Sequence, residues 1–305
     1  MAELLEELRP RAFAIAYRML GSVSEAEDVV QEGLMRLHGV LEAGEAIEVP
    51  EAYLATVVTR LAIDRLRSAR VRRESYVGEW LPEPMVTEGR DDPAAHAEMS
   101  DSLSLAFLVL LERLSPDQRA VFLLRDVFDY PYDTIADIVG KGETAVRQLA
   151  VRARRHIEQD RPRFEASRRE HEELARRFMT AARTGDLVGL EALLAHDVGL
   201  HADGGGKARA LVHPVFGRHG VARAIVGWMR GLRGIEGYSI RPVEVNGHAG
   251  AVGLDGNQRV LHVMSLDIVD GQIQGIRSIA NPDKLRRFGR LAVPPWPDPV
   301  EVSSD

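Results

Sequence analysis

The chain has 305 residues, a formal net charge of −7, 45% hydrophobic and 28% charged residues, and no cysteine. This length and composition predict two or three folded domains rather than a disordered chain. The absence of cysteine excludes disulfides, thiolate zinc sites and cysteine nucleophiles, and it fits a reducing cytoplasm, where we expect the protein to act. The acidic, amphipathic N-terminus does not read as a signal peptide. No apolar run approaches the roughly 20 residues that cross a bilayer, so no membrane contact is expected.

The charge is segregated along the chain. Residues 1–50 carry ten acidic residues and four arginines, whereas residues 60–73 carry six arginines and one aspartate. Residues 141–163 carry seven basic and three acidic residues. Local patches of one sign, not the total charge, decide which partner a surface attracts. The first segment therefore suits a basic partner, and the two basic segments suit the phosphates of DNA.

Helical spacing of apolar residues predicts helices through the first half of the chain. The first helix is expected to end at Leu20, before Gly21. Ser24 is expected to begin the second, because acidic residues that favour a helix N-terminus follow it. Pro50 is a first-turn residue for the third helix, which leads into the arginines of residues 60–73.

Residues 74–98 are rich in proline and glycine and predict a linker. Within them, Trp80-Leu81-Pro82-Glu83-Pro84 is too apolar for a plain spacer, so we expect it to pack on another part of the protein. The helical pattern returns at Leu103. Ser115-Pro116-Asp117-Gln118 then has the form of a capping box with proline at the first helical position.

Residues 132–158 have the form of a helix-turn-helix. Gly140 is expected to end the first short helix with a left-handed cap. Apolar residues of the second helix, from Val146 to Ile157, lie on one face. Its other face and flanks carry Glu143, Thr144, Arg147, Gln148, Arg152, Arg154 and Arg155. A recognition helix has this arrangement, with polar side chains for base edges and arginines for phosphates; a merely solvated basic face is the alternative.

From about residue 170 the pattern changes. Helices are expected at 171–184, from Gly185-Asp186 onward, and at 218–230, and strands at 198–202, 238–246, 249–254, 258–268 and 272–279. This order predicts an α+β domain with an antiparallel sheet. Residues 203–207 are expected to form a glycine loop with positive φ, whose flanking Asp203 and Lys207 could pair with each other or hold a partner. Asn281-Pro282 predicts the cap and first turn of a short helix. The proline-rich tail, residues 291–305, is expected to be flexible.

Three of these motifs, taken in order, resemble the extracytoplasmic-function sigma factors of bacterial RNA polymerase. The string from Gly21 to Glu32 resembles the domain 2 helix that docks on the β′ subunit. Residues from Pro50 to Arg73, with Ala52-Tyr53-Leu54 and Ile63-Asp64-Arg65-Leu66-Arg67, resemble the part that melts and reads the −10 element. The stretch from Leu114 to His156 resembles domain 4, which reads the −35 element. The resemblance covers nearly all of residues 5–160.

The resemblance implies roles for individual residues. Contact with core polymerase, through its β′ and β subunits, falls to Asp28, Gln31 and Glu32. Contact with the −10 element falls to Ile47, Glu48, Arg60, Asp64, Arg65, Arg67, Arg70, Arg72 and Arg73. Contact with the −35 element falls to the polar residues of the recognition helix, Glu143 to Arg155. Few aromatic residues lie near the melting surface, only Tyr53 and Tyr76, so narrower promoter choice is expected.

The C-terminal region resembles the SnoaL-like cone fold of a subgroup of these sigma factors. Three strings carry this resemblance: Trp80-Leu81-Pro82-Glu83-Pro84, Asp203-Gly204-Gly205-Gly206-Lys207 and Asn281-Pro282-Asp283-Lys284-Leu285. In that subgroup the fused domain is understood to replace a separate anti-sigma factor. The resemblance implies that the cone domain packs near the linker and that these strings are regulatory.

We therefore expect a multidomain protein with two all-α domains and a C-terminal α+β cone domain. The expected boundaries are 1–74 for sigma domain 2, 75–100 for the linker, 101–165 for sigma domain 4, 168–290 for the SnoaL-like domain and 291–305 for the tail. Core RNA polymerase and promoter DNA are the expected partners.

Two alternatives are left open. One is a helix-turn-helix regulator that senses a small molecule through the cone domain and does not bind polymerase. The other is a cone-fold enzyme, because this fold hosts acid–base catalysts. The candidate acid–base residues in the domain include His196, His201, His213, His219, His248 and His262. No metal-ligand spacing stands out among these histidines. We expect no enzyme activity, no metal and no cofactor, whereas an unidentified ligand of the cone domain is not excluded.

Overall fold

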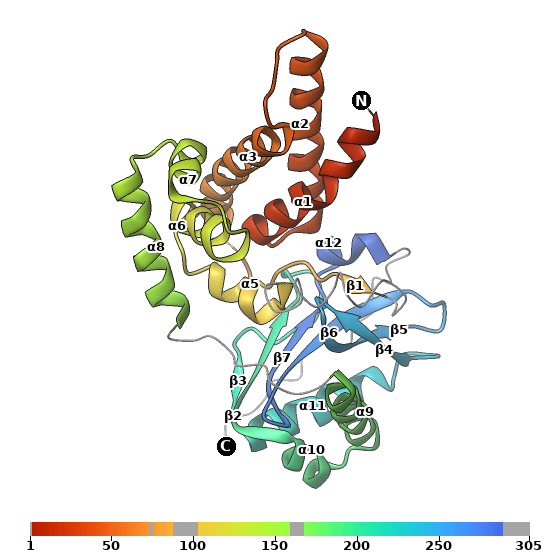
Figure 1. Cartoon of the computed structure of the whole chain (residues 1–305). Helices are drawn as coiled ribbons and strands as arrows, with labels where there is room; N and C mark the ends of the chain where they lie inside the picture. Colours follow the sequence, from red (N-terminus) through yellow and green to blue (C-terminus); the bar gives the residue numbers. More distant parts are fainter. Residues whose placement is uncertain (1, 74–75, 88–102, 159–167, 289–305) are drawn as a thin grey trace. The chain divides into compact units, whose positions relative to one another are not determined.

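The computed structural model describes residues 2–73, 76–87, 103–158 and 168–288 (Figure 1). The chain divides into two compact units. Residues 1–75 and 107–161 form the first, and residues 76–106 and 162–305 form the second. The described part of the predicted linker, residues 76–87, therefore belongs to the same unit as the C-terminal domain. The predicted tail at 291–305 lies outside the described residues. Among the described residues, no helix is long and apolar enough to cross a membrane.

Domain 2 of the first unit contains three helices that pack on one another: α1 (Ala2–Leu20), α2 (Val23–Glu42) and α3 (Pro50–Arg73). Gly21 ends α1 with a positive φ of 63°. The prediction that Ser24 begins the second helix was wrong, because the Ser22 side chain is the cap and accepts a hydrogen bond from the Glu25 amide. Pro50 begins α3 as predicted.

Domain 4 contains α5 (Leu105–Leu111), α6 (Pro116–Phe122), a π-helical turn η2 (Leu123–Val127), α7 (Tyr132–Val139) and α8 (Glu143–Glu158). The predicted capping box is confirmed. Ser115 Oγ accepts from the Gln118 amide, and Gln118 Oε1 accepts from the Ser115 amide. Gly140 ends α7 in the left-handed conformation, with φ 66° and ψ 39°. Val146, Ala150 and other apolar residues of α8 pack on α7, which completes the helix-turn-helix.

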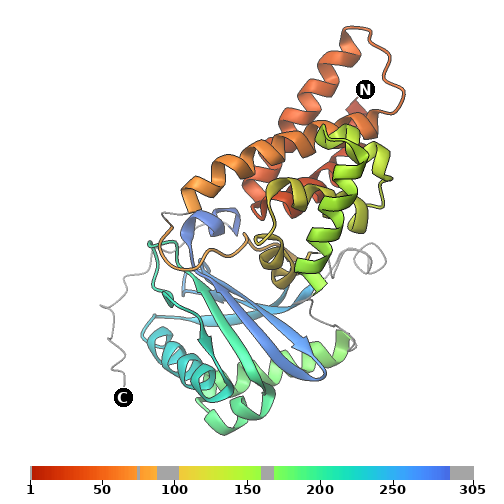
Figure 2. The ribbon, with the colours of Figure 1, turned by 90° about the vertical axis from the view of Figure 1, so that its left-hand side faces the viewer.

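The second unit is an α+β domain. Helices α9 (Arg168–Thr184), α10 (Leu187–Leu193) and α11 (Arg218–Leu232) lie on one face of a sheet (Figures 1 and 2). The strands are β1 (Val86–Thr87), β2 (Leu194–Asp203), β3 (Val215–Phe216), β4 (Ser239–Val245), β5 (His248–Leu254), β6 (Val260–Val269) and β7 (Gln272–Ile279). Helix α12 (Pro282–Leu285) and the 3-10 turn η3 (Arg286–Phe288) follow.

The strand order is β1-β4-β5-β6-β7-β2-β3. The predicted antiparallel sheet was wrong for one pair, since β2 and β7 run parallel. A parallel pair requires a long crossover, which α11 and the four strands between β2 and β7 in the chain supply here. The sequence prediction also missed β1 and β3. Each has only two residues, too few to show an alternating pattern.

Alternate residues of the long strands face the helices and form the core. Met264 and Leu266 of β6 and Ile276 of β7 pack with Phe178 of α9 and Ile225 of α11. This period of two is what a sheet with one helix-covered face requires. The opposite face presents His201, Asp203 and Arg277, and residues of the linker lie against it.

His262 of β6 is buried on the helix-covered side. It is 2% exposed, its Nε2 lies 2.9 Å from the Tyr238 hydroxyl, and its ring centroid lies 4.5 Å from that of Trp228. Burial lowers the pKa of His262 to about 3. Gly253, its cross-strand neighbour on β5, leaves room for the ring, because an added Cβ would overlap the imidazole.

We expect Gly253→Ala to destabilise the C-terminal domain by about 1–3 kcal/mol, because the buried imidazole must then move within a packed core. Gly227→Ala is the matched control: no atom lies within 4 Å of its added Cβ. In a helix, that change should raise stability by up to about 1 kcal/mol. Urea unfolding followed by tryptophan fluorescence measures both. Equal stability of Gly253→Ala and the unsubstituted protein would contradict the packing argument.

The neutral, buried His262 also predicts a pH dependence. Between its folded pKa of about 3 and the ordinary value of 6.5, the unfolded state binds a proton that the folded state does not. The free energy of unfolding should therefore fall as pH drops from about 6.5, by at most ~1.4 kcal/mol per pH unit. His262→Phe should remove this part of the slope in urea titrations, whereas His219→Phe, at an exposed histidine, should keep it. Identical slopes for all three proteins would show that His262 does not titrate in this way.

Candidate functional site

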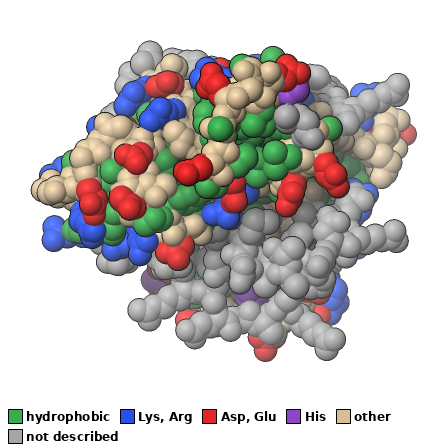
Figure 3. All heavy atoms as spheres, turned by 45° about the horizontal axis from the view of Figure 1, so that its top comes forward, with side chains coloured by type: hydrophobic (Ala, Val, Ile, Leu, Met, Phe, Trp, Pro, Cys, Tyr) green, Lys and Arg blue, Asp and Glu red, His purple; other side chains and the backbone are tan. Residues whose placement is uncertain are grey.

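The three predicted polymerase-contact residues lie together on α2. Asp28, Gln31 and Glu32 line one surface depression of about 440 Å³ with Met35 and Arg36. Glu32 accepts from Arg36 Nη2 at 2.6 Å, so one acidic residue of the group is already paired. Met35 is 67% exposed. Figure 3 shows a face of the molecule on which charged side chains likewise border hydrophobic ones. An exposed methionine beside acidic residues suits a protein partner that offers basic and apolar groups.

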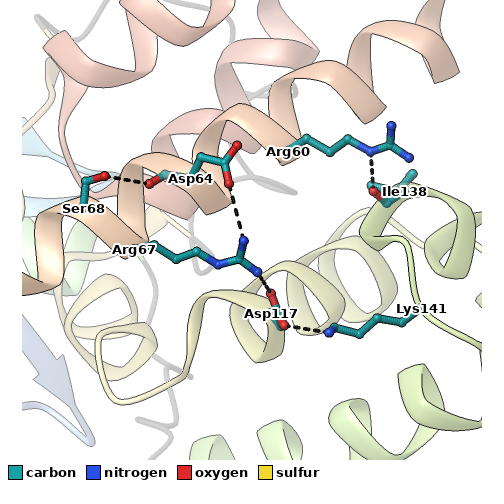
Figure 4. Close-up of polar contacts among 7 residues, drawn as sticks. All are labelled: Arg60, Asp64, Arg67, Ser68, Asp117, Ile138 and Lys141. Atoms are coloured by element: carbon teal, nitrogen blue, oxygen red, sulfur yellow. Dashed lines mark hydrogen bonds and ion pairs between the residues drawn. The ribbon is translucent and has the colours of Figure 1, made fainter.

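Two arginines of α3 contact domain 4 (Figure 4). Arg60 donates from Nε to the carbonyl of Ile138 at 2.9 Å and from Nη2 to that of Asp137 at 2.8 Å. These carbonyls belong to the last turn of α7, where the helix dipole favours a cation. Arg67 lies 3.2 Å from Asp117 of α6, which also binds Lys141 at 3.1 Å. Both arginines were predicted to contact the −10 element.

An arginine of domain 4 makes the reciprocal contact. Arg119 of α6 is 2% exposed and donates from Nη1 to the Met19 carbonyl, in the last turn of α1, at 2.6 Å. It also donates to the Leu111 carbonyl and lies 2.7 Å from Glu112. Burial lowers the pKa of Arg119 to about 9. Each domain thus supplies an arginine to a helix C-terminus of the other.

The other predicted −10 residues are less engaged in the structure. Ile47 is half-buried and Glu48 is exposed, in the loop before α3. Asp64 is exposed and Arg65 half-buried. The side chains of Arg70, Arg72 and Arg73 lie outside the described residues.

The outer face of α8 is polar and open. Six of its seven predicted DNA-contact residues are exposed: Glu143, Thr144, Arg147, Gln148, Arg152 and Arg155. Arg147 is paired with Glu143 and lies over the Tyr132 ring, 4.4 Å from its centroid. Arg154 differs from the rest, because it is half-buried and lies 2.7 Å from Asp126. That pair stabilises domain 4 itself.

In the second unit, a buried carboxylate organises the predicted regulatory strings. Asp203, at the end of β2, is fully buried. Its Oδ1 accepts from the Tyr76 hydroxyl at 2.5 Å, and its Oδ2 accepts from the Leu81 amide at 2.9 Å and from Lys284 Nζ at 2.6 Å. The Lys284 ammonium also donates to the Leu81 carbonyl and lies 4.1 Å from the Trp80 ring centroid. One carboxylate therefore joins all three strings.

The glycines of residues 203–207 are required by close approach. Gly205 and Gly206 have φ of 60° and 68°. A Cβ at Gly205 would overlap the Asn281 amide, and one at Gly206 would lie 3.1 Å from Val77. Of the two possibilities left open for Asp203 and Lys207, pairing with each other is not what the structure shows, because Lys207 lies 2.5 Å from Asp283 and Asp203 pairs with Lys284. The helix predicted after Asn281 is confirmed as α12, with Leu285 buried.

Several residues of this cluster were not predicted from the sequence. Tyr76 was expected only as an aromatic residue near the melting surface, yet its hydroxyl hydrogen-bonds to Asp203 within the second unit. Burial and the Asp203 carboxylate raise the pKa of this hydroxyl. Glu79 lies 2.8 Å from Nδ1 of His201 and beside Arg277, which pairs with Asp267. These residues do not belong to a recognisable sequence motif. The only signal was that Tyr76 and Glu79 shortly precede an apolar string in an otherwise polar linker.

Within the described residues, no group of three or more histidine, aspartate or glutamate side chains could hold a metal ion. The first unit presents an acidic and apolar surface on α2, arginines on α3, and a polar and basic face on α8.

Comparison with known proteins identifies the class. Residues 4–72 match the family model "Sigma-70 region 2", and residues 104–157 match "Sigma-70, region 4". The ECF RNA polymerase sigma factor SigJ of Mycobacterium tuberculosis (strain ATCC 25618 / H37Rv) is 39% identical over 289 residues, which cover 92% of this chain and 91% of SigJ. The probable ECF sigma factor SigI of the same strain is 37% identical over 175 residues, 57% of this chain and 59% of SigI.

A solved structure agrees over nearly the whole length. The crystal structure of M. tuberculosis SigJ superposes with a TM-score of 0.76 at 36% identity, and the match covers 94% of this chain and 98% of that one. Two helical domains carrying regions 2 and 4 define a sigma factor. The chain belongs to the extracytoplasmic-function sigma factors of bacterial RNA polymerase. Such factors bind core RNA polymerase and promoter DNA and are not enzymes. The two alternatives left open by the sequence therefore lose their support.

We expect Asp203→Asn to destabilise the second unit by about 3 kcal/mol or more, because it leaves Lys284 as a buried charge without its carboxylate. Asp283→Asn is the matched control within the same cluster. The side chains of Asp283 and Lys207 are 40% and 55% exposed, so removing that pair should cost less than about 1 kcal/mol. Urea unfolding of the full chain measures both. Similar losses for the two variants would contradict a central role for Asp203.

Proposed function

We propose that this sigma factor reads promoters at two elements and that its own C-terminal domain controls it in place of a separate anti-sigma factor. The α2 surface at Asp28, Gln31 and Glu32 binds core polymerase. The loop before α3 and the arginines of α3 bind the −10 element, and α8 binds the −35 element. The observation that carries the regulatory part is the linker: residues 76–87 belong to the fold of the C-terminal domain.

The contacts within the first unit support a step of domain opening. Arg60 and Arg67 are held by domain 4, so their guanidinium groups are not free for phosphates. Promoter DNA must therefore displace the C-terminus of α7 from Arg60 and Asp117 from Arg67 before its phosphates can bind these two side chains. The carbonyls at a helix C-terminus carry partial negative charge and a phosphate carries a full one, so both accept hydrogen bonds from a guanidinium. The phosphate contacts also gain from released counterions. Opening is expected to precede or accompany promoter binding.

The cluster around Asp203 supports control by the C-terminal domain. Lys284 of α12 donates a hydrogen bond to the carbonyl of Leu81 and packs on Trp80, so α12 contacts the linker directly. Any change that displaces α12 frees the connection between the two DNA-reading domains. In full-length protein, Lys284→Met should therefore change the transcript yield severalfold relative to unsubstituted protein. A small-molecule ligand of this domain stays a prediction from the sequence.

The polymerase contact is tested by Met35→Asp, which places a charge at an exposed apolar position without disturbing the core. We expect affinity for core polymerase to fall by roughly tenfold or more, as at a central apolar contact. Val188→Asp is the matched control, because Val188 is 79% exposed on α10 of the C-terminal domain. Binding is measured by fluorescence anisotropy of labelled protein with core polymerase.

Transcription in vitro on a promoter library completes the test. The unsubstituted protein should yield promoter-specific transcripts, and Met35→Asp should reduce them in proportion to its lost affinity. Full binding by Met35→Asp would refute the proposed α2 surface. The absence of any specific transcript from the unsubstituted protein would refute the proposed promoter recognition.

A further inference from the structure

The turn between β4 and β5 holds the linker at two points that lie far apart in the sequence. Asn246 is 2% exposed. Its backbone N–H donates to the Met85 carbonyl at 2.8 Å, and its side-chain Oδ1 accepts from the backbone N–H of Met85 at 2.9 Å. Its Nδ2 donates to the Leu103 carbonyl at 2.8 Å. One residue therefore binds the chain on both sides of residues 86–102.

The turn alone does not require this side chain. Asn246 has φ 53° and Gly247 has φ 79°, as a two-residue Asn-Gly hairpin turn demands. Glycine at position 246 would satisfy the same backbone. The buried side chain is explained instead by its contacts with Met85 and Leu103. Pairing of Val86 with Val245 and of Thr87 with Glu244 continues the Met85 contact as the short strand β1.

This contact has a consequence for the distance that the linker spans. Met85 and Leu103 both bond to the Asn246 side chain. While both bonds hold, the residues between these two anchors do not lengthen the connection between domain 2 and domain 4. Fully extended, they would add roughly 60 Å to it. Each base pair between two DNA elements adds about 3.4 Å and turns the helix by roughly 35°. A free linker therefore tolerates many spacings, and a closed one tolerates few.

We propose that Asn246 is a specificity-determining residue that restricts the spacing between the −35 and −10 elements, by closing the linker at Met85 and Leu103. The proposal rests on the promoter recognition proposed above. It adds that the C-terminal domain holds the linker while the two domains are bound to DNA. Asn246 acts through the linker and touches no DNA, so it is a positioning residue.

Two substitutions separate the parts of this contact. Asn246→Gly keeps the positive φ of the turn and removes both side-chain bonds. Asn246→Asp keeps the acceptor for the Met85 amide but removes the donor to the Leu103 carbonyl and places a carboxylate beside it. Asn257→Gly is the matched control, because Asn257 is an exposed residue of the turn after β5. Circular dichroism and thermal unfolding verify that all the variants fold.

Hydrogen exchange on the free, full-length protein tests the anchor itself. Loss of one hydrogen bond should speed exchange of the Met85 amide by roughly fivefold in Asn246→Gly. Asn246→Asp should leave that amide protected, and Asn257→Gly should match the unsubstituted protein. Unchanged Met85 exchange in Asn246→Gly would overturn the proposal without reference to transcription.

Transcription with core polymerase on promoters whose spacer differs in steps of one base pair tests the function. The unsubstituted protein and Asn257→Gly should show a narrow optimum. For each protein, we compare the transcript yield at spacers two base pairs from the optimum with the yield at the optimum. This ratio should be severalfold higher for both Asn246 variants than for the unsubstituted protein. Unchanged spacing profiles despite faster Met85 exchange would overturn the proposal. If the unsubstituted protein gives no transcripts at any spacing, the proposed promoter recognition is refuted. The hydrogen-exchange measurement still tests whether Asn246 holds the linker at Met85.

Discussion

The buried carboxylate of Asp203 is the interaction on which the second unit depends. A carboxylate removed from water is stable only where hydrogen bonds and an opposite charge replace its hydration. Here Tyr76 and the Leu81 amide come from the linker, and the Lys284 ammonium comes from α12. The backbone carbonyl of Asp203 also accepts from the amides of Ala280 and Asn281. Three distant segments must therefore be in place together, which couples the linker to the end of the described chain.

The described linker residues are consequently part of the C-terminal domain, in addition to connecting domain 2 with domain 4. It supplies a strand to the sheet, an aromatic face to Lys284 and a carboxylate, Glu79, to His201. An edge strand of the sheet is thus also part of the connection between the two helical domains. This shared strand is the physical basis for the self-regulation that we propose.

In the first unit, arginine has two uses that exclude each other. The planar guanidinium binds phosphate well, and for the same reason it binds the carbonyls at a helix C-terminus. Arg60 and Arg119 use the second possibility, each across the contact between domains 2 and 4. Arg60 and Arg67 are therefore both occupied by contacts with domain 4 in this structure. The polar face of α8 is exposed.

Local signals in the sequence determined much of this protein. The capping box at Ser115, the left-handed Gly140 and Pro50 at the start of α3 depend on neighbouring residues, and all three were predicted. The ordered motifs of regions 2 and 4 were sufficient to predict the family. What only the tertiary structure decided depends on contacts between residues far apart in the chain: the parallel pairing of β2 with β7, the two-residue strand β1, and the bonds of Asn246 to Met85 and Leu103. An asparagine before a glycine predicts a turn, but which groups its side chain binds is decided by what folding brings beside it.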